Sequence, residues 1–530
     1  MRRLAAVLIL MSAVALAQGA PAKSKPAAAK TKTAAASGNL VALPSPSPLY
    51  QIQIMVRAGS ANDPAGKEGT ASLVADALIE GGFGNAKNPT TKEKLAEITR
   101  PWGDAALPEI RVDKEATLIS VIVPKDSLQP FLAQVLRPML QQPLFQEKEI
   151  ERLRKEALVN IQSRLRFEQQ ELLGLLALDN AIFDGTVLGH VPAGTVKGLN
   201  AITRQDLVDF YKKYYTRANV FIATTISDAG EQNAVAAVLP AGGTASAPPD
   251  AQPAPVQGRS LTIITQPNAI ATGIHLGFPI DVKRGDADYW PLFVANVFLG
   301  THRDSFGHLY QTIREARGYN YGDYSYIEYL AGRPFFLFPP PGTPRTQQYF
   351  SIWIRPVAHQ YTHFVTKAAT AELDNFIQTG LTPEQVESAK NKARTLYLKY
   401  SDSKSRQLGY KLDDMFYGTK DHGYLDDMLK SVEAVTPEQV NAAIKKHLQV
   451  ANLKYVIVTN DSEGAKLADD IANNTNVTNK SLAEYHISEP VPPEKQALLK
   501  QDDAWKAYPL NIARDHITIV KAEQMFEGDK

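Results

Sequence analysis

Two short stretches of this chain carry side chains whose types and spacing could do chemistry. In the first, Ser72 and Asp76 are four residues apart within residues 71–79, an apolar stretch that we predict to be a helix, so both lie on one helix face. Such a face can share a metal ion, but a serine hydroxyl is a poor ligand and Asp76 supplies a single carboxylate. Ala75, between them, cannot move a proton. The stretch therefore predicts a buried helix without catalytic chemistry.

The second stretch holds Arg314 and Tyr321, seven residues apart, with Gly318 between them. A guanidinium offers several fixed hydrogen-bond donors and a phenol offers one. Together they could hold a peptide carbonyl or stabilise an oxyanion as negative charge develops. The alternative is structural, with an exposed helix arginine, a helix C-cap at Gly318 and a tyrosine packed in a sheet.

The elements that would position these residues occur twice along the chain. Thr203 and Thr436 are each N-cap candidates for an amphipathic helix, and the asparagine sixteen residues after each threonine opens an apolar strand. The matched stretches are residues 220–225 with 453–459, 146–151 with 383–387, and 73–76 with 293–296. Four elements in the same order indicate two homologous α+β halves, each a mostly antiparallel sheet covered by helices.

Composition limits the classes of function that are open to the chain. Its 530 residues are enough for two to four domains, and 44% hydrophobic with 21% charged residues is typical of a globular protein. The formal net charge of +1 favours neither a nucleic acid nor an anionic membrane surface as a partner. The chain has no cysteine, which excludes disulfides and thiolate metal sites. No apolar stretch after the N-terminus is long enough to predict a transmembrane segment.

The N-terminus is typical of a cleaved secretory signal. Arg2 and Arg3 precede an apolar stretch, residues 4–16, and the small residues around Ala17 fit a cleavage site. We therefore expect export to the periplasm or the extracellular space. The predicted boundaries are 1–17 for the signal peptide, 18–40 for a flexible tether, 41–240 for the first half, 241–258 for a linker, 259–490 for the second half, and 491–530 for a C-terminal extension. Within that extension, residues 517–520 could add a strand that covers a sheet edge of the second half.

Residues 59–78 resemble the signature of the pitrilysin/insulinase-like zinc metallopeptidases (inverzincins). In that family a helix carries H-x-x-E-H, and the matching positions here read Ser72-Leu73-Val74-Ala75-Asp76. The third ligand of the family, a glutamate on a later helix, corresponds to Asn160, or to Glu156 if the alignment register shifts. The resemblance implies two halves that close like a clamshell around a cavity. It also implies that this chain binds no zinc, because the metal-site positions are degenerate.

Residues 309–321 resemble the R-E-x-x-G-x-x-Y segment of the same family, with Arg314 and Tyr321 at its arginine and tyrosine. In two-subunit members, one chain carries H-x-x-E-H and the other carries this pair, which approaches the bound peptide. The resemblance implies a non-catalytic subunit that is inactive alone. It would supply Arg314 and Tyr321 to a homologous, zinc-bearing partner that cleaves peptides or unfolded proteins.

Two other readings stay open at the level of sequence. The chain could be a non-enzymatic peptide-binding or scaffold protein on the peptidase fold. It could also be an enzyme with a rebuilt metal site, which the lost ligands disfavour. The substrate, the partner and the choice between homodimer and heterodimer are not fixed by the sequence.

Overall fold

The computed structural model describes residues 39–330, 340–419, 422–478, 480–483 and 491–528. The expected signal peptide, 1–17, and all but the last two residues of the expected tether, 18–40, lie outside the described residues. Among the described residues, no helix combines the length and the apolar character needed to cross a membrane.

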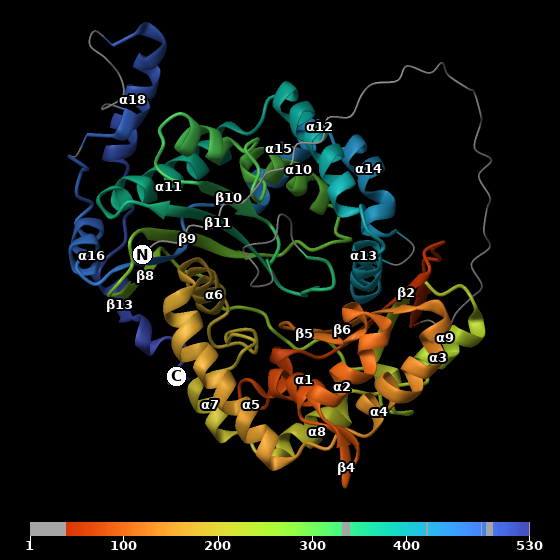
Figure 1. Ribbon diagram of the computed structural model, residues 1–530. Coiled ribbons are helices and arrows are strands. Elements are labelled where there is room, and N and C mark those ends of the chain that lie inside the picture. Colours follow the sequence, from red (N-terminus) through yellow and green to blue (C-terminus); the bar gives the residue numbers. More distant parts are fainter. Residues whose placement is uncertain (1–38, 331–339, 420–421, 479, 484–490, 529–530) are drawn as a thin grey trace, which may run out of the picture. The chain divides into compact units, whose positions relative to one another are not determined.

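Two mixed sheets organise the chain (Figure 1). We call the elements from β1 to α9 the first half and those from β8 to α16 the second half. The first sheet has the order β1-β7-β2-β6-β5, and the second has the order β10-β11-β9-β12-β8-β13. The strands of the first sheet are β1 (Leu40–Ala42), β2 (Leu49–Val56), β5 (Glu109–Val112), β6 (Thr117–Pro124) and β7 (Val220–Thr224). Those of the second are β8 (Ser260–Gln266), β9 (Thr272–Ile280), β10 (Gly322–Tyr326), β11 (Gln348–Val357), β12 (Lys454–Asn460) and β13 (Ile517–Lys521).

The two sheets repeat one topology, which confirms the internal repeat. In the first sheet β1 and β7 are parallel and every other neighbouring pair is antiparallel. In the second sheet β8 and β12 are the parallel pair, followed by antiparallel β9, β11 and β10 in the same spatial order. The added strand β13 lies parallel to β8 at the sheet edge, as the sequence predicted for the extension. The fold class is therefore the expected α+β arrangement of two similar halves.

The helices repeat as well. Helices α1 (Thr70–Glu80), α5 (Glu147–Val159) and α8 (Arg204–Tyr214) pack together in the first half. Helices α10 (Tyr289–Gly300), α12 (Pro383–Tyr400) and α15 (Pro437–His447) do so in the second. Thr203 and Thr436 cap α8 and α15 as predicted, each through a capping box that satisfies free amide groups at the helix start.

Each half also contributes one helix to the other half's sheet. Helix α6 (Gln170–Ile182), from the first half, packs on β9 and β12, and α13 (Lys404–Tyr417), from the second half, packs on β7 and β2 (Figure 1). At the first of these contacts Gly174 faces the buried His275, where a Cβ atom would overlap the imidazole ring. Each sheet is therefore covered in part by a helix from the other half.

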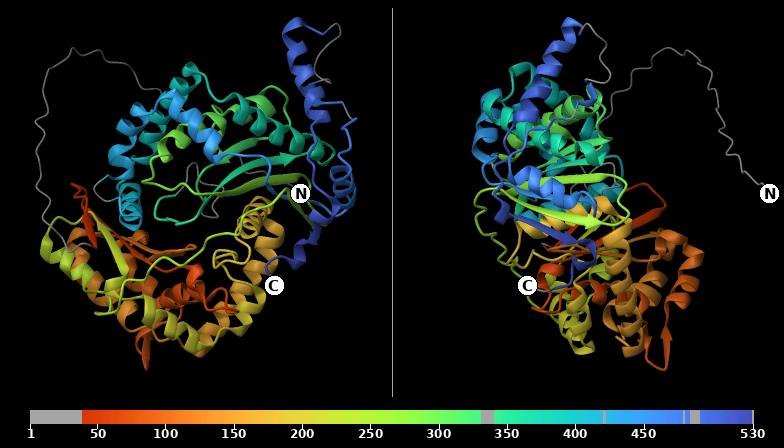
Figure 2. Two further views of the ribbon diagram at one scale, coloured as in Figure 1. Left: turned by 180° about the vertical axis from the view of Figure 1, so that it is seen from behind. Right: turned by 90° about the vertical axis from the view of Figure 1, so that its left-hand side faces the viewer.

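The remaining elements complete the two cores and the C-terminal region (Figures 1 and 2). Residues 241–258, between the halves in the sequence, contain no helix or strand. The first half also contains β3 (Phe83–Asn85), β4 (Asn88–Thr90), α2 (Lys92–Thr99), α3 (Leu128–Phe131), α4 (Arg137–Gln141), α7 (Val196–Ala201) and α9 (Ala229–Ala236). The second half contains α11 (Thr362–Thr379), α14 (Tyr424–Ala434) and α16 (Gly464–Ala472), and α18 (Pro493–Ala507) follows it.

Candidate functional site

Helix α1 starts where the sequence places its glycine. Gly69 precedes the helix with φ of 109°, a backbone conformation that glycine adopts without steric cost. The buried carboxylate of Asp63 accepts hydrogen bonds from the backbone amides of Gly69 and Ala71, each at 2.7 Å. His190 lies against the same carboxylate, with 3.2 Å between Nε2 and Oδ2. This histidine therefore supports the helix start.

The three degenerate positions on α1 differ in their surroundings. The Ser72 hydroxyl donates a hydrogen bond of 2.5 Å to the backbone carbonyl of Pro192, and Ala75 is buried. Asp76 keeps an exposed side chain. Partial desolvation, followed by the negative charges of Glu80 and Glu156, raises the pKa of Asp76 to about 6. One carboxyl group that ionises late and one occupied hydroxyl make a weak ligand pair.

The two candidates for the third metal ligand, Asn160 and Glu156, have other surroundings or partners. Asn160 begins the π-helical turn Asn160–Glu168 after α5 and lines a pocket of about 190 Å³ together with Val191 and Pro192. Glu156 is held by Arg152 at 2.8 Å.

Arg152 is a site residue that the sequence reasoning missed. Its guanidinium also binds Glu149 at 2.9 Å and Glu80 at 3.2 Å, so three carboxylates converge on one fixed cation. The sequence did contain a local signal for these ion pairs, because Glu149, Arg152 and Glu156 have the i,i+3 and i,i+4 spacing of neighbours on a helix surface.

These residues do not fit a zinc ion. A catalytic zinc takes about three protein ligands plus an open position, with imidazole or carboxylate donors converging on one point. Here the Ser72 hydroxyl is hydrogen-bonded to a backbone carbonyl, and the Ala75 side chain has no atom that can bind a metal. The nearby glutamates bind the guanidinium of Arg152. Within the described residues, no group of three or more histidines, aspartates or glutamates is arranged to hold a metal.

The structure brings Arg314 and Tyr321 together. Arg314 lies in the π-helical turn Tyr310–Glu315, and its guanidinium carbon is 5.6 Å from the ring centroid of Tyr321. The same guanidinium stacks on Tyr310 at 4.8 Å and bonds to the Tyr310 hydroxyl and the Glu315 carboxylate. Tyr321 is 74% exposed, and the Arg314 side chain is 28% exposed. The pair is therefore accessible to a ligand from solvent.

A buried carboxyl group, that of Asp323, lies close to this pair in sequence, and the charge of Arg314 acts on it. Asp323, on β10, accepts a hydrogen bond of 2.6 Å from the Asn320 side chain, and both residues are buried. Burial raises the pKa of Asp323 to about 8, although Asn320 and Arg314 oppose the shift. The sequence offered no signal for this, since an aspartate in a short strand usually faces solvent.

The tyrosine-rich stretch 319–329 forms a shorter strand than expected. Only Gly322–Tyr326 pairs as β10, antiparallel to β11. The two histidines before it have structural partners: His302 bonds to the Tyr326 hydroxyl, and His308 lies 2.7 Å from Glu372.

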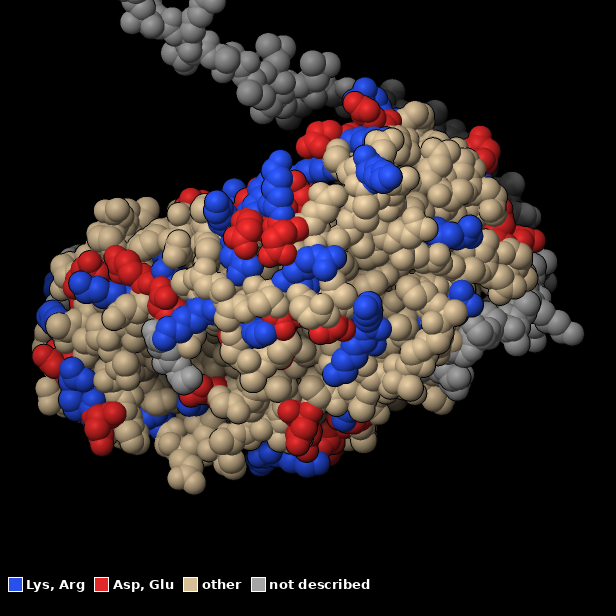
Figure 3. Space-filling model, turned by 90° about the horizontal axis from the view of Figure 1, so that it is seen from below, with Lys and Arg blue, Asp and Glu red and all other residues tan. Residues whose placement is uncertain are grey.

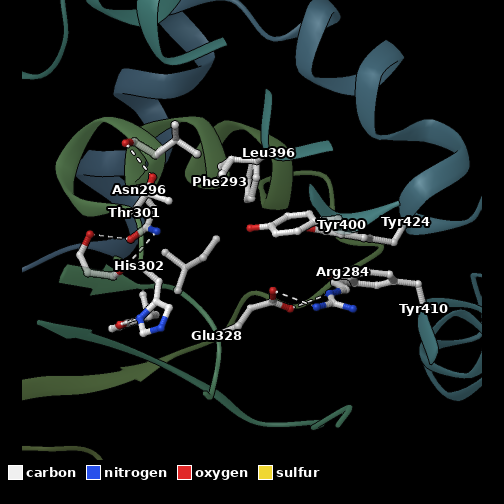
Figure 4. Close-up of a pocket in the computed structure, with 14 residues that line it drawn as sticks. Arg284, Phe293, Asn296, Thr301, His302, Glu328, Leu396, Tyr400, Tyr410 and Tyr424 are labelled. Carbon is white, nitrogen blue, oxygen red and sulfur yellow. Dashed lines mark hydrogen bonds and ion pairs between the residues drawn. The ribbon is translucent and has the colours of Figure 1, made fainter. Parts of the chain in front are cut away.

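A pocket in the second half occupies the place that corresponds to the degenerate site. It is a small space of about 50 Å³ beside α10 and α12, the counterparts of α1 and α5 (Figure 4). Arg284 fills one side, bound to Glu328 at 2.8 Å and to Asp413 at 3.0 Å and stacked 4.3 Å from the centroid of Tyr424. The charged groups of this pocket are thus paired with one another.

A larger groove, lined by both polar and apolar residues, lies against the first sheet. It measures about 430 Å³ and lies between the edge strand β5 and the start of α13. Its polar lining comprises Gln51, Gln53, Asp104, Glu109, Arg111, Ser120, Ser405 and Arg406. On the face shown in Figure 3, positive and negative side chains are interspersed, in keeping with the near-zero net charge.

Comparisons with known proteins agree with this reading. Residues 201–393 match the family described as the Peptidase M16 inactive domain. An uncharacterized zinc protease of Streptomyces coelicolor is 27% identical over 305 residues, which cover 55% of this chain and 62% of the relative. An uncharacterized zinc protease of Mycobacterium bovis is 26% identical over 276 residues, which cover 51% of this chain and 58% of the relative. The matches thus span about three fifths of the length of these relatives.

Solved structures share the fold at low sequence identity. A peptidase M16 inactive domain from Pseudomonas fluorescens superposes with a TM-score of 0.67 at 23% identity, covering 79% of this chain and 94% of that one. A protease from Helicobacter pylori gives a TM-score of 0.67 at 13% identity, covering 79% and 96%. The family match over residues 201–393 and the shared fold make this chain similar to the pitrilysin/insulinase-like (M16) metallopeptidases, and it reads Ser72-Leu73-Val74-Ala75-Asp76 where that family carries H-x-x-E-H.

Proposed function

We propose that this chain is the non-catalytic subunit of an exported zinc peptidase. In this role it supplies Arg314 and Tyr321 to the peptide-binding cavity of a homologous partner chain that carries H-x-x-E-H and the zinc. The observation that carries the proposal is a contrast within one molecule. The metal-site positions on α1 are replaced, while the arginine and tyrosine are held together and reach solvent.

The pair has the chemistry that peptide binding needs. The guanidinium of Arg314 presents several N–H donors and the phenol of Tyr321 presents one, so both can donate to a peptide carbonyl. The present partner of Arg314, Glu315, is itself exposed and adjacent in sequence. Exposed ion pairs contribute about 0–1 kcal/mol, so an incoming carbonyl can displace this one at little cost.

The groove beside β5, with its mixed polar and apolar lining, supports a peptide ligand as the substrate class. Its volume of about 430 Å³ suits a short extended segment rather than a folded domain. Among the described residues β5 is the last strand of its sheet, and an extended peptide can bind beside such a strand through main-chain groups. Unfolded or partly unfolded proteins in the export compartment would present segments of this kind.

The test is a cleavage assay with this chain alone, with an H-x-x-E-H chain encoded beside it, and with both mixed in the presence of zinc. Cleavage of unfolded protein is expected from the mixture and not from this chain alone. Arg314→Ala and Tyr321→Phe should each lower the rate of the mixture by about tenfold to a thousandfold, the range for removing a group that stabilises a transition state. Arg394→Ala is the matched control, because Arg394 is a partly exposed arginine on α12 bound to Glu387 and Glu433.

One structural feature favours a second candidate, a non-enzymatic peptide-binding or scaffold protein. Contacts join the two halves, including the buried ion pair of Arg345 with Asp179 and the partly buried hydrogen bonds of Gln53 to Ser405. A scaffold has no need to open for substrate. Under this reading the chain forms a stable complex with its partner, and the cleavage rate does not depend on Arg314 or Tyr321.

A further inference from the structure

The C-terminal extension reaches the segment that carries Arg314 and Tyr321. Arg317 is three residues after Arg314, and its side chain is fully buried. It lies between the turn Tyr310–Glu315 and helix α18 of the extension (dark blue in Figures 1 and 2), which packs against α11. A buried guanidinium needs a counter-charge, and the extension supplies it.

The contacts of Arg317 account for most of its donors. Nε donates to Asp502 at 2.6 Å, and Nη2 donates to Gln501 at 2.9 Å. Its guanidinium carbon lies 4.0 Å from the ring centroid of Trp505, a cation–π contact removed from water. Nη1 donates at 2.7 Å to the backbone carbonyl of Thr312, within the turn that holds Arg314. One side chain therefore joins that turn to α18.

Further contacts surround the place where the turn Tyr310–Glu315 is joined to α18. The Tyr319 hydroxyl accepts a hydrogen bond of 3.0 Å from the backbone amide of Leu482, and the Ser481 hydroxyl bonds to the second oxygen of Asp502. Trp505 and Gln501 both donate to the buried Glu372 of α11, at 3.2 and 2.9 Å. The residues flanking Arg314 and Tyr321 are thus anchored while the pair itself reaches solvent.

We propose that the C-terminal extension positions the Arg314–Tyr321 pair for its peptide ligand, through the buried Arg317–Asp502 ion pair. This inference rests on the proposed function of that pair. Arg317 and Asp502 are positioning residues, because they act through the turn rather than on the peptide. Since the turn Tyr310–Glu315 is short and is followed by Gly318, with φ of 84°, its geometry depends on such outside contacts.

The test compares Asp502→Asn with Asp503→Asn in the full chain. Asp503 is the next residue on α18 and its side chain is 76% exposed, so it is a matched control. Hydrogen exchange of residues 310–321 is measured without any partner. Affinity for fluorescein-labelled, heat-denatured casein is measured by anisotropy for each variant, alone and combined with Arg314→Ala. Gln501→Ala, which removes only one contact of Arg317, serves if Asp502→Asn does not fold.

We expect Asp502→Asn to speed exchange in residues 310–321 and to weaken casein binding, each by about tenfold, with no change for Asp503→Asn. In the Arg314→Ala background Asp502→Asn should cause no further loss of affinity, because the two changes remove one interaction. A general loss of stability would not produce this non-additivity.

Three results overturn the positioning role: unchanged exchange in residues 310–321, faster exchange with unchanged affinity, or losses that add to that of Arg314→Ala. Failure of the proposed function has a different signature. A wild-type chain that binds no casein, either alone or mixed with the H-x-x-E-H chain, while Asp502→Asn still loosens residues 310–321, overturns the peptide-binding role and supports the structural contact.

Discussion

Arg345 and Asp179 form an ion pair that joins the two halves, with 2.6 Å between Nη1 and Oδ1 and neither side chain exposed. Asp179, on α6, also binds the buried Lys114 at 2.9 Å. The guanidinium of Arg345 stacks on Phe183 at 4.1 Å from the ring centroid. A charge cluster of this kind costs free energy to desolvate, so its value for stability depends on every partner being present.

Asp179→Ala is therefore expected to lower the free energy of unfolding by about 3–5 kcal/mol, because Arg345 and Lys114 would stay buried without their carboxylate. Urea denaturation followed by circular dichroism measures the change. Glu433→Ala removes an exposed partner of Arg394 and should cost less than about 1 kcal/mol. Equal effects of the two substitutions would contradict the buried junction.

Gly174→Ala tests the exchanged helix. An alanine Cβ at this position would overlap the ring of His275, so α6 must move away from β9. We expect a loss of about 1–3 kcal/mol in stability, the usual cost of overpacking a core. Gly230→Ala in α9, where only the side chain of Asp228 is near, should change stability by less than about 1 kcal/mol. A thermal shift assay that ranks the two variants equally would argue against close packing of α6.

Asp323 gives a prediction for pH. Burial raises the pKa of Asp323 to about 8, so the folded state holds a proton that the unfolded state releases near pH 4. The contribution of this group to stability is full below about pH 4 and is lost as the pH rises to about 8, at a slope approaching 1.4 kcal/mol per pH unit. Asp323→Asn removes the titration and should remove that slope.

The measurement is the free energy of unfolding of wild type and Asp323→Asn between about pH 5 and about pH 8. The difference between the two proteins should shift in favour of the variant as the pH rises. Asp503→Asn is the control, because it makes the same chemical change at an exposed position. Parallel curves for wild type and Asp323→Asn would show that Asp323 is ionised in the folded state.

The last residues of the extension contact both halves: they cover a sheet edge of the second half, as the sequence led us to expect, and they also bind the first half. Strand β13 pairs with β8, and Glu527 binds Arg166 of the first half at 2.6 Å. Deleting residues 513–530 should expose the edge of β8 and promote self-association. Size-exclusion chromatography at increasing concentration measures this, and a monomeric deletion variant would contradict it. Glu527→Gln, which leaves β13 in place, is the control that should stay monomeric.

Much of the fold could be predicted from local sequence. The paired caps at Thr203 and Thr436, followed by apolar strands, indicated a repeat that the two sheet topologies confirm. The absence of good zinc ligands at Ser72 and Ala75 could also be predicted, because it depends on the residue types and not on their surroundings. Such inferences depend on residue type and short spacing, which a sequence displays directly.

Only the tertiary structure decided how the distant parts combine. Ser72 bonds to the carbonyl of Pro192, and Arg317 pairs with Asp502, across 120 and 185 residues of chain. A buried charge selects its partner by geometry and desolvation, and both depend on where the whole chain folds. The sequence by itself therefore determined which side chains stand at the positions of H-x-x-E-H, and the tertiary structure decided which side chains hold Arg314 and Tyr321 in place.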